Sequence, residues 1–256
     1  LGNSAIGFYL LVLSENNESV RMVDGTSFFK AERRQNVLTD QDVESILTCY
    51  EKDTEQSCRL SMAQLAANGY VLEPQRYLTK TDPRLEKAWT VDDVCTVSRG
   101  FVTGAGLLDE LVSSEPTAYR YLMVQDLENG RIRADLPYLK ELPERGASAC
   151  LQQGDILLSK MAPFKTALAD DVQDEQVLVT GNVYILRCQD DAIEPAYLML
   201  YLQSALGLSE LNYWAKGSHI QNIAIGDLRK VRIPILSKEK QQAMAQQYRK
   251  LSEAMK

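Results

Sequence analysis

Short β-rich runs scattered among helical segments constrain the fold of this chain most. The runs are four or five residues long, and turn residues or charges bound them. Strands are therefore expected at residues 121–124, 156–159, 177–180, 183–186 and 231–235. Because strands and helices do not alternate regularly, the pattern predicts a mixed α+β fold and not a doubly wound parallel sheet.

Three helix starts are marked by local signals. Thr39 precedes Asp40 and Asp42, which suit an N-cap and an acidic first turn. Ser61 and Gln64 have capping-box spacing. Pro195 fits the first turn of a helix, where its missing N–H costs nothing. Apolar residues follow the first cap at helical spacing, at Val43, Ile46, Leu47 and Tyr50.

The first 25 residues predict an antiparallel hairpin. Two β-rich runs, 8–13 and 20–23, flank a polar loop at 14–18. Two strands alone are marginally stable, so the hairpin should complete a larger sheet. The apolar run begins almost at residue 1, and we expect the chain to be a fragment of a longer one.

A polar stretch at residues 78–87, which contains Pro83, is the expected domain boundary. The predicted organisation is a small helical and hairpin domain over 1–85, an α+β domain over 86–236, and a terminal helix over 237–256.

The terminal helix has two possible roles. Met244, Tyr248, Leu251 and Met255 follow one another at steps of four, three and four, as in a coiled-coil seam that could pair two copies or dock a partner. Only about two heptads are present, so a helix folded onto its own domain is the alternative.

Composition excludes several classes of protein. The net charge of -7 argues against an indiscriminate nucleic-acid binder, although a local basic patch remains compatible with it. The five cysteines are scattered without a C-x-x-C pair, which indicates reduced thiols and no zinc site. No apolar run approaches the length of a membrane span and no leader pattern is present, so a cytoplasmic location is expected.

No pattern predicts a catalytic or metal site. The glycine-rich segment 100–106 lacks the Lys and Ser/Thr of a phosphate-binding loop, so it is predicted to be a flexible loop. Because it is flexible and near Arg99, it could still contact a ligand. The acidic cluster at 170–175 lacks calcium-loop spacing and reads as solvated. No nucleophile has a recognisable base beside it.

The loop after Trp214 carries the residue types that read DNA. Its amides, hydroxyl and imidazole suit base edges, and the alternative is a polar surface loop that caps backbone groups. These residues are Ser218, His219, Gln221 and Asn222.

Basic residues in the middle domain are outnumbered by acidic ones, 13 to 20 over residues 90–236. In residues 237–256 the balance is five to two in favour of basic residues. Lys160, Lys165 and Lys216, together with Arg229, Lys230 and Arg232, lie at expected strand ends or loops. They would contact phosphates if folding gathers them, and scattered solvated cations are the alternative.

The ordered series of motifs in the second part resembles a known family. The segments 154–160 (GDILLSK), 195–204 (PAYLMLYLQS), 217–223 (GSHIQNI), 233–236 (IPIL) and 241–242 (QQ) resemble the target-recognition domain of type I restriction-modification specificity subunits. The resemblance covers residues 89–256 and implies double-stranded DNA binding. The resemblance also implies roles for individual residues. Phosphates would be held by Lys160, Lys165 and Lys216, and bases would be approached by Ser218, His219, Gln221 and Asn222.

The first part is similar to the C-terminal end of the adenine-N6 methylase subunit of the same systems. The similar segments are 23–25 (VDG), 36–42 (NVLTDQD), 61–65 (SMAQL) and 68–77 (NGYVLEPQRY). That family's cofactor glycine motif and its Asn-Pro-Pro-Tyr/Phe motif are not in this sequence. The resemblance therefore implies that this chain alone neither binds S-adenosylmethionine nor methylates DNA, and that the parent protein uses this cofactor.

The sequence thus predicts a reader of DNA targets that directs an adenine-N6 methyltransferase, with methylase and restriction subunits as partners. Two alternatives stay open. The chain could be an architectural module that docks a partner without reading bases, or a methyltransferase fragment that binds the cofactor in an unrecognised way.

Overall fold

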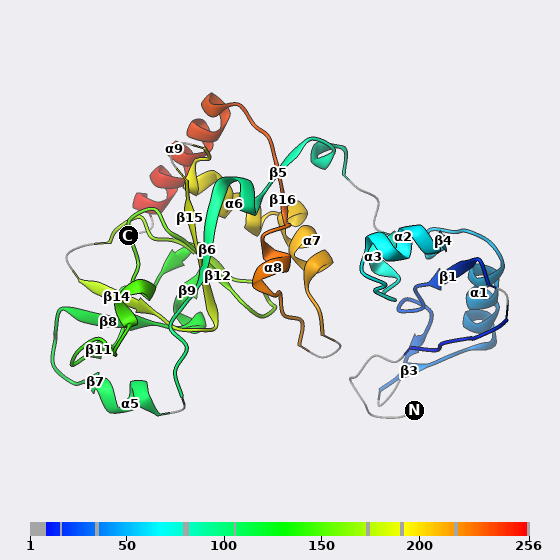
Figure 1. Cartoon of the computed structure of the whole chain (residues 1–256), viewed down its shortest axis with the longest axis horizontal. Helices are drawn as coiled ribbons and strands as arrows, with labels where there is room; N and C mark the ends of the chain where they lie inside the picture. The colour runs from blue at the N-terminus through cyan, green and yellow to red at the C-terminus, as the bar shows by residue number, and fades with distance from the viewer. Residues whose placement is uncertain are drawn as a thin grey trace. The chain divides into compact units, whose positions relative to one another are not determined.

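The structure is a computed structural model that describes residues 9–15, 17–33, 36–78, 82–104, 106–172, 175–189, 192–217 and 220–254. The chain divides into two compact units, Leu1–Asp82 and Pro83–Lys256 (Figure 1). Each unit has its own core of buried apolar side chains. Within the described ranges, no helix combines the length and the apolar character that crossing a membrane requires.

Unit 1 is built on two antiparallel strands, β1 (Ser19–Val23) and β4 (Ser57–Ser61). Helices α1 (Asp40–Glu51), α2 (Met62–Ala67) and α3 (Gln75–Leu78) accompany them, and β2 (Lys30–Ala31) pairs with β3 (Asn36–Val37). The core is small, with Met22, Leu60 and Leu65 at its centre.

The expected hairpin between residues 8–13 and 20–23 is wrong. β1 pairs with β4, which lies some 40 positions further along the chain, and residues 9–13 form no strand. The run 9–13 is continuously apolar, and its side chains are 59–85% exposed. It therefore lacks the alternation of a two-stranded ribbon with one solvated face.

Both predicted caps in unit 1 are confirmed. Thr39 accepts from the backbone N–H of Asp42, whose carboxylate accepts from the backbone N–H of Thr39 in return. Ser61 and Gln64 make the same reciprocal pair at the start of α2. The side-chain bonds hold the pKa of Asp42 below its usual value.

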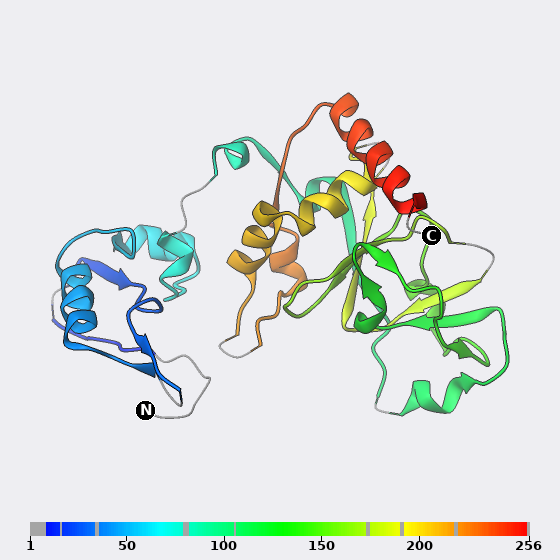
Figure 2. The same cartoon turned by 180° about the vertical axis from the view of Figure 1, so that it is seen from behind.

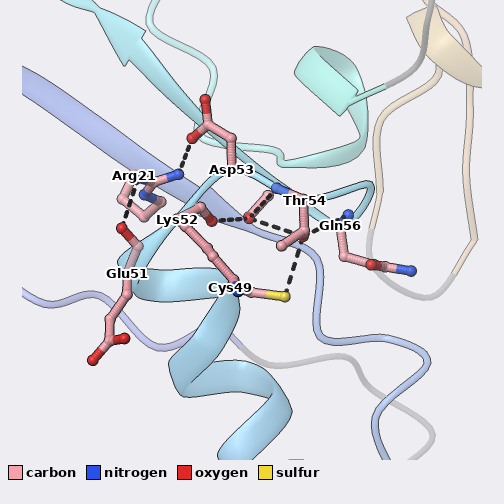
Figure 3. A network of polar contacts seen from close by, with 8 residues as sticks. Arg21, Cys49, Glu51, Lys52, Asp53, Thr54 and Gln56 are labelled. Carbon is pink, nitrogen blue, oxygen red and sulfur yellow. Dashed lines mark hydrogen bonds and ion pairs between the residues drawn. The ribbon is translucent and has the colours of Figure 1, made fainter.

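A polar network fixes the turn between α1 and β4 (Figure 3). Thr54 Oγ1 lies 3.3 Å from Cys49 Sγ and 3.0 Å from Ser57 Oγ, and Ser57 donates to the carbonyl of Lys52. Arg21 on β1 pairs with Asp53 in this turn. The network joins the helix to the strand pair, so its role is structural.

Unit 2 is centred on a four-stranded antiparallel sheet in the order β13-β12-β15-β6 (Figure 1). These strands are β6 (Cys95–Arg99), β12 (Ile156–Ser159), β13 (Thr166–Leu168) and β15 (Val183–Cys188). Alternate residues serve two clusters: Ile156 and Leu158 belong to one, and Leu157 to the other. The sheet is therefore covered on both faces, which is why these strands are nearly all apolar.

A second sheet has the order β14-β8-β11-β7, and β14 and β8 run parallel. Its strands are β7 (Val112–Ser113), β8 (Tyr119–Leu122), β11 (Tyr138–Leu139) and β14 (Gln176–Val179). β5 (Ala88–Thr90) pairs with β16 (Arg232–Pro234), and β9 (Leu127–Glu128) with β10 (Arg131–Ile132).

The larger helices of unit 2 are α6 (Pro195–Gln203), α7 (Ala205–Trp214) and α9 (Lys238–Ala254). Pro195 is the first helical residue of α6, as predicted. Shorter elements complete the unit: η1 (Pro83–Leu85), α4 (Val91–Val94), α5 (Leu107–Leu111), η2 (Val124–Asp126), η3 (Gly146–Ala149) and α8 (Ile225–Leu228). The mixed α+β class and the terminal helix are both confirmed.

The terminal helix α9 packs on its own unit along one side. Gln241, Ala245 and Ser252 are buried, and Gln241 accepts from the backbone N–H of Glu194 at the start of α6. Tyr248 donates from its hydroxyl to the carbonyl of Gly130. On the adjacent side Met244 is 37% exposed and Leu251 is 59% exposed, while Met255 lies outside the described residues.

Candidate nucleic-acid interface

All four strands of the central sheet present a turn or loop at the same end. At this end β12 and β6 finish, and β13 and β15 begin. We call this surface the loop end; it comprises residues 99–104, 159–166, 179–183, 215–217 and 220–223. Figure 2 shows the same sheet from behind, with the loop between α7 and α8 beside it.

The turn between β12 and β13 is held by a buried hydroxyl. Ser159 donates from its hydroxyl to the carbonyl of Met161 and accepts from the backbone N–H of Lys165, at 3.0 and 2.9 Å. The backbone N–H of Ser159 also donates to the carbonyl of Lys165. Lys160 and Lys165 are therefore fixed at the two ends of one turn.

The loop after α7 is closed by a pair of backbone hydrogen bonds. Lys216 and Asn222 donate to each other's carbonyls at 2.8 and 2.9 Å, and the Asn222 side chain adds a bond to the Lys216 carbonyl. Gly217 has φ of 131°, and a Cβ there would lie 2.3 Å from the Ile220 carbonyl oxygen, so the position requires glycine. Ser218 and His219 lie outside the described residues.

These two segments lie side by side. The backbone N–H of Ala162 donates to the carbonyl of Gln221, and that of Ile223 donates to the carbonyl of Lys160. The buried hydroxyl of Tyr184 donates to the carbonyl of Ile223 at 2.9 Å, and burial raises the pKa of this phenol. The sheet thus brings Lys160, Gln221 and Asn222 together.

Lys216 is also held by an acidic residue that sequence reasoning missed. Its Nζ lies 2.9 Å from Oδ2 of Asp227, while Nζ of Lys230 lies 3.1 Å from Oδ1. Burial opposes ionisation of Asp227, but the bonds from the two lysines outweigh it and lower its pKa. Lys230 also lies over the ring of Trp214, 5.0 Å from the centroid.

The first part of the glycine-rich segment is not a phosphate cradle. The backbone N–H groups of Gly100 and Phe101 donate to Val183 and Val179, so they are already used. A Cβ on Gly100 would lie 2.3 Å from the carbonyl oxygen of Thr180, so this glycine serves a close backbone approach. Arg99 donates to the carbonyl of Gly181 and so joins the loop end.

Asn182 is a further exposed amide at the loop end. Its carbonyl accepts from the backbone N–H of Lys160 at 2.8 Å. Sequence reasoning passed over it, although the Thr180-Gly181-Asn182 run between two strands is a turn signal that could have marked it.

The loop end contains no acidic residue in a chain that has 35 of them. It carries four cationic side chains: Arg99, Lys160, Lys165 and Lys216. At the other end of the same sheet stand carboxylates, at Asp92, Asp93, Asp155 and Asp170. Asp155 and Asp92 pair there with Arg187 and Arg229, so cations lie at both ends of the sheet, whereas the residues of the loop end include no carboxylate.

The other candidate cations are paired inside unit 2. Arg229 lies 3.5 Å from Asp92, and Arg232 makes a two-pronged bond to the buried carboxylate of Glu210. Within the described residues, neither Lys160 nor Lys165 has a carboxylate partner within ion-pair distance. These two lysines are therefore the most available for a phosphate.

Comparisons with known families divide the chain in two. Residues 2–85 match the family model described as N-6 DNA Methylase, and residues 87–255 match that of the Type I restriction modification DNA specificity domain. No curated protein gives a significant match.

Solved structures similar to this chain include the S subunit of a type I restriction-modification system from M. genitalium. It is 19% identical, has a TM-score of 0.46, and 68% of this chain and 41% of that one are covered. The HsdS subunit from Thermoanaerobacter tengcongensis is 15% identical with a TM-score of 0.43, and the match covers 88% of this chain and 57% of that one. The type IIG restriction endonuclease BpuSI is 11% identical with a TM-score of 0.52, and the match covers 91% of this chain and 35% of that one. This similarity is one of fold alone. The chain spans less than two thirds of each.

Proposed function

Because this chain belongs to the Type I restriction modification DNA specificity domain family through residues 87–255, we propose that it recognises the DNA target of a type I restriction-modification system. The observation that carries the proposal is the loop end, whose residues supply four cations and several amides and no carboxylate of their own, in a chain of net charge -7. Asp227, next to the loop end, pairs with Lys216 and leaves Lys160 and Lys165 as its most available cations. Such a surface attracts phosphates while the acidic remainder repels them, so DNA is oriented toward one end of the sheet.

The proposed roles follow from the chemistry of each side chain. Lys160, Lys165 and Lys216 contact phosphates, which fixes the register of the duplex without reading sequence. Gln221 and Asn222 approach base edges, where an amide pairs well with adenine N6 and N7. Ser218 and His219 belong to the same loop and are proposed as further base contacts.

The reaction that this reader would serve is adenine-N6 methylation. The match of residues 2–85 to the N-6 DNA Methylase family supports this proposal. Methylase and restriction subunits of the same system are then the partners. This chain itself is proposed to bind no S-adenosylmethionine, and saturable heat on calorimetric titration with it would instead favour the fragment as a cofactor-binding methyltransferase piece.

Selection of bound duplexes from a random pool tests the reading role. We expect an enriched sequence motif with the full chain, and a change in that motif, with little loss of affinity, when Gln221 is changed to Ala. Asn222 is kept because its side chain also closes the loop through the carbonyl of Lys216. Binding without any enriched motif would favour the architectural alternative, in which the chain docks a partner and reads nothing.

A further inference from the structure

Two cysteines face each other across the central sheet of unit 2. Cys95 is the first residue of β6 and Cys188 is the last residue of β15, and the register of these antiparallel strands places them directly opposite one another. Their side chains therefore lie on the same face of the sheet, and the two Sγ atoms are 3.6 Å apart. Both thiols are free. Because 93 positions separate the two residues, no spacing rule in the sequence reveals the pair.

The backbone at this pair suits a bond between the two sulfurs. The backbone N–H of Gln189 donates to the carbonyl of Val94, so the neighbouring pair of the ladder is a hydrogen-bonded one. Pairs alternate along an antiparallel ladder, so Cys95 and Cys188 form a non-hydrogen-bonded pair, in which the Cα atoms lie about 4.5 Å apart. A disulfide needs a Cα separation of roughly 4.4–6.8 Å. The sulfurs can therefore bond through side-chain rotation, with little movement of the strands.

The two thiols differ in burial and in protonation. Cys95 is 1% exposed, whereas Cys188 is only partly buried. Cys95 donates its S–H to the sulfur of Cys188, and this hydrogen bond together with burial raises the pKa of Cys95. Cys95 thus keeps its proton at neutral pH, and Cys188 is the thiol that a reagent from solvent meets first. Since the pair stands at the ends of both strands, local opening there gives the reagent access.

The other cysteines lack this arrangement. Sγ of Cys49 contacts the hydroxyl of Thr54, and Sγ of Cys150 contacts the carbonyl of Gly146. Among the described residues, no other two thiols lie within hydrogen-bond distance of each other. A single buried cysteine commonly serves as a small apolar side chain. Two thiols in contact across a strand pair can in addition undergo thiol–disulfide exchange.

We propose that Cys95 and Cys188 form a redox-active dithiol, which a small-molecule disulfide converts into a cross-strand disulfide that locks β6 to β15. The thiolate of Cys188 attacks one sulfur of the small disulfide, so that a mixed disulfide forms and one small thiol leaves. Cys95 then gives up its proton and attacks the sulfur of Cys188, which releases the second small thiol. The two protein thiols lose two protons and two electrons, and the small disulfide gains them as two thiols.

The lock acts on the stability of unit 2. The disulfide closes a loop that spans 93 positions, which restricts the unfolded chain. Oxidation should therefore raise the thermal midpoint by about 5 °C or more, and a reducing agent should reverse the shift. The pair lies at the end of the sheet opposite the loop end, so the inference does not depend on the DNA-reading role.

Incubation of the full chain in mixtures of oxidised and reduced glutathione tests the proposal. The remaining free thiols are alkylated, and the chain is digested with trypsin without reduction. Mass spectrometry should then find residues 88–99 joined to residues 188–216, with the loss of two hydrogen atoms. If both thiols stay free in excess oxidised glutathione, or if another pair of cysteines is joined instead, the proposal is overturned.

Single variants separate the attacking thiol from the resolving one. Cys95→Ala should stop at the mixed disulfide, so that Cys188 carries one glutathione, whereas Cys188→Ala should leave Cys95 reduced. Cys150→Ala is the matched control and should form the cross-strand disulfide as the wild type does. A wild type that stops at the mixed disulfide, as Cys95→Ala should, would overturn the proposal. None of these results depends on DNA, so a failure of the DNA-reading role leaves them unchanged.

Discussion

Nζ of Lys216 lies 2.9 Å from Oδ2 of Asp227, and the same carboxylate holds Lys230 through its other oxygen. The ion pair anchors the foot of the loop whose amides are proposed to read DNA. It also neutralises part of the charge that would attract phosphates, so the three side chains together carry a single net positive charge.

Replacing Asp227 with Asn should therefore separate two effects: that of charge near the loop end on DNA affinity, and that of loop anchoring on the discrimination between duplexes. One more positive charge near the loop end should tighten non-specific binding and steepen its salt dependence, by up to about one phosphate contact. The loss of the anchor should reduce discrimination between target and non-target duplexes. Asp92→Asn, which frees Arg229 at the opposite end of the sheet, is the matched control. Equal salt slopes in all three proteins would contradict the placement of DNA at the loop end.

The same ion pair has a predictable pH dependence. The folded-state pKa of Asp227 is lowered from its usual 3.8, so its contribution to stability is present above pH 3.8 and is lost as pH falls further, through the folded-state pKa. Because both lysines are more than half exposed, the pair should contribute only about 1 kcal/mol. Urea unfolding of the wild type and Asp227→Asn should differ at pH 7 and converge in strong acid. A difference that persists unchanged there would exclude the ionised pair as its cause.

The lysines of the β12–β13 turn should act alike on all duplexes. Lys160→Ala and Lys165→Ala should each lower affinity for target and non-target DNA similarly, and reduce the salt slope by about one. Binding titrations between low and moderate salt measure both quantities. Lys240→Ala on α9 removes the same charge elsewhere and should leave the slope unchanged. An unaltered slope for a turn variant would remove that lysine from the phosphate contacts.

The buried pair of Glu210 and Arg232 should support unit 2 without affecting DNA reading. Glu210 is 5% exposed and also accepts from the backbone N–H of Arg232. Glu210→Ala leaves the guanidinium without its partner and should cost about 2 kcal/mol, toward the low end because Arg232 is partly solvated. Chemical unfolding measures the loss, and a selected DNA motif should be retained by the folded fraction. A neutral effect would mean that solvent replaces the carboxylate fully.

Local chemistry accounts for what the sequence predicts well. The caps at Thr39 and Ser61 and the start of α6 at Pro195 depend on residues within four positions, so a short window contains all the information. The partner of β1 is different, because β4 lies far along the chain and nothing local specifies it. The nearby apolar run at 9–13 was the obvious partner and the wrong one.

The candidate site divides in the same way, into residues that the sequence identifies by type and contacts that only the fold reveals. Residue types picked out Lys160, Gln221 and Asn222 separately, but only the sheet topology places the β12–β13 turn against the loop after α7. The pairing of Lys216 with Asp227 spans 11 positions and crosses a loop, with no periodicity to reveal it. The sequence shows that none of the five segments of the loop end contains an acidic residue, but only the fold shows that these segments meet at one surface.

The two sides of α9 should respond oppositely to substitution. Ala245 is 1% exposed against the rest of unit 2, so Ala245→Arg would force a large charged group into packed space and should lower the thermal midpoint strongly. Leu251 is 59% exposed, so Leu251→Lys should leave the midpoint nearly unchanged. If the exposed side of α9, which carries Met244 and Leu251, pairs two copies, sedimentation equilibrium should show a dimer for the wild type and a monomer for Leu251→Lys. A wild type that stays monomeric at high concentration would instead assign α9 to its own unit alone or to a different subunit.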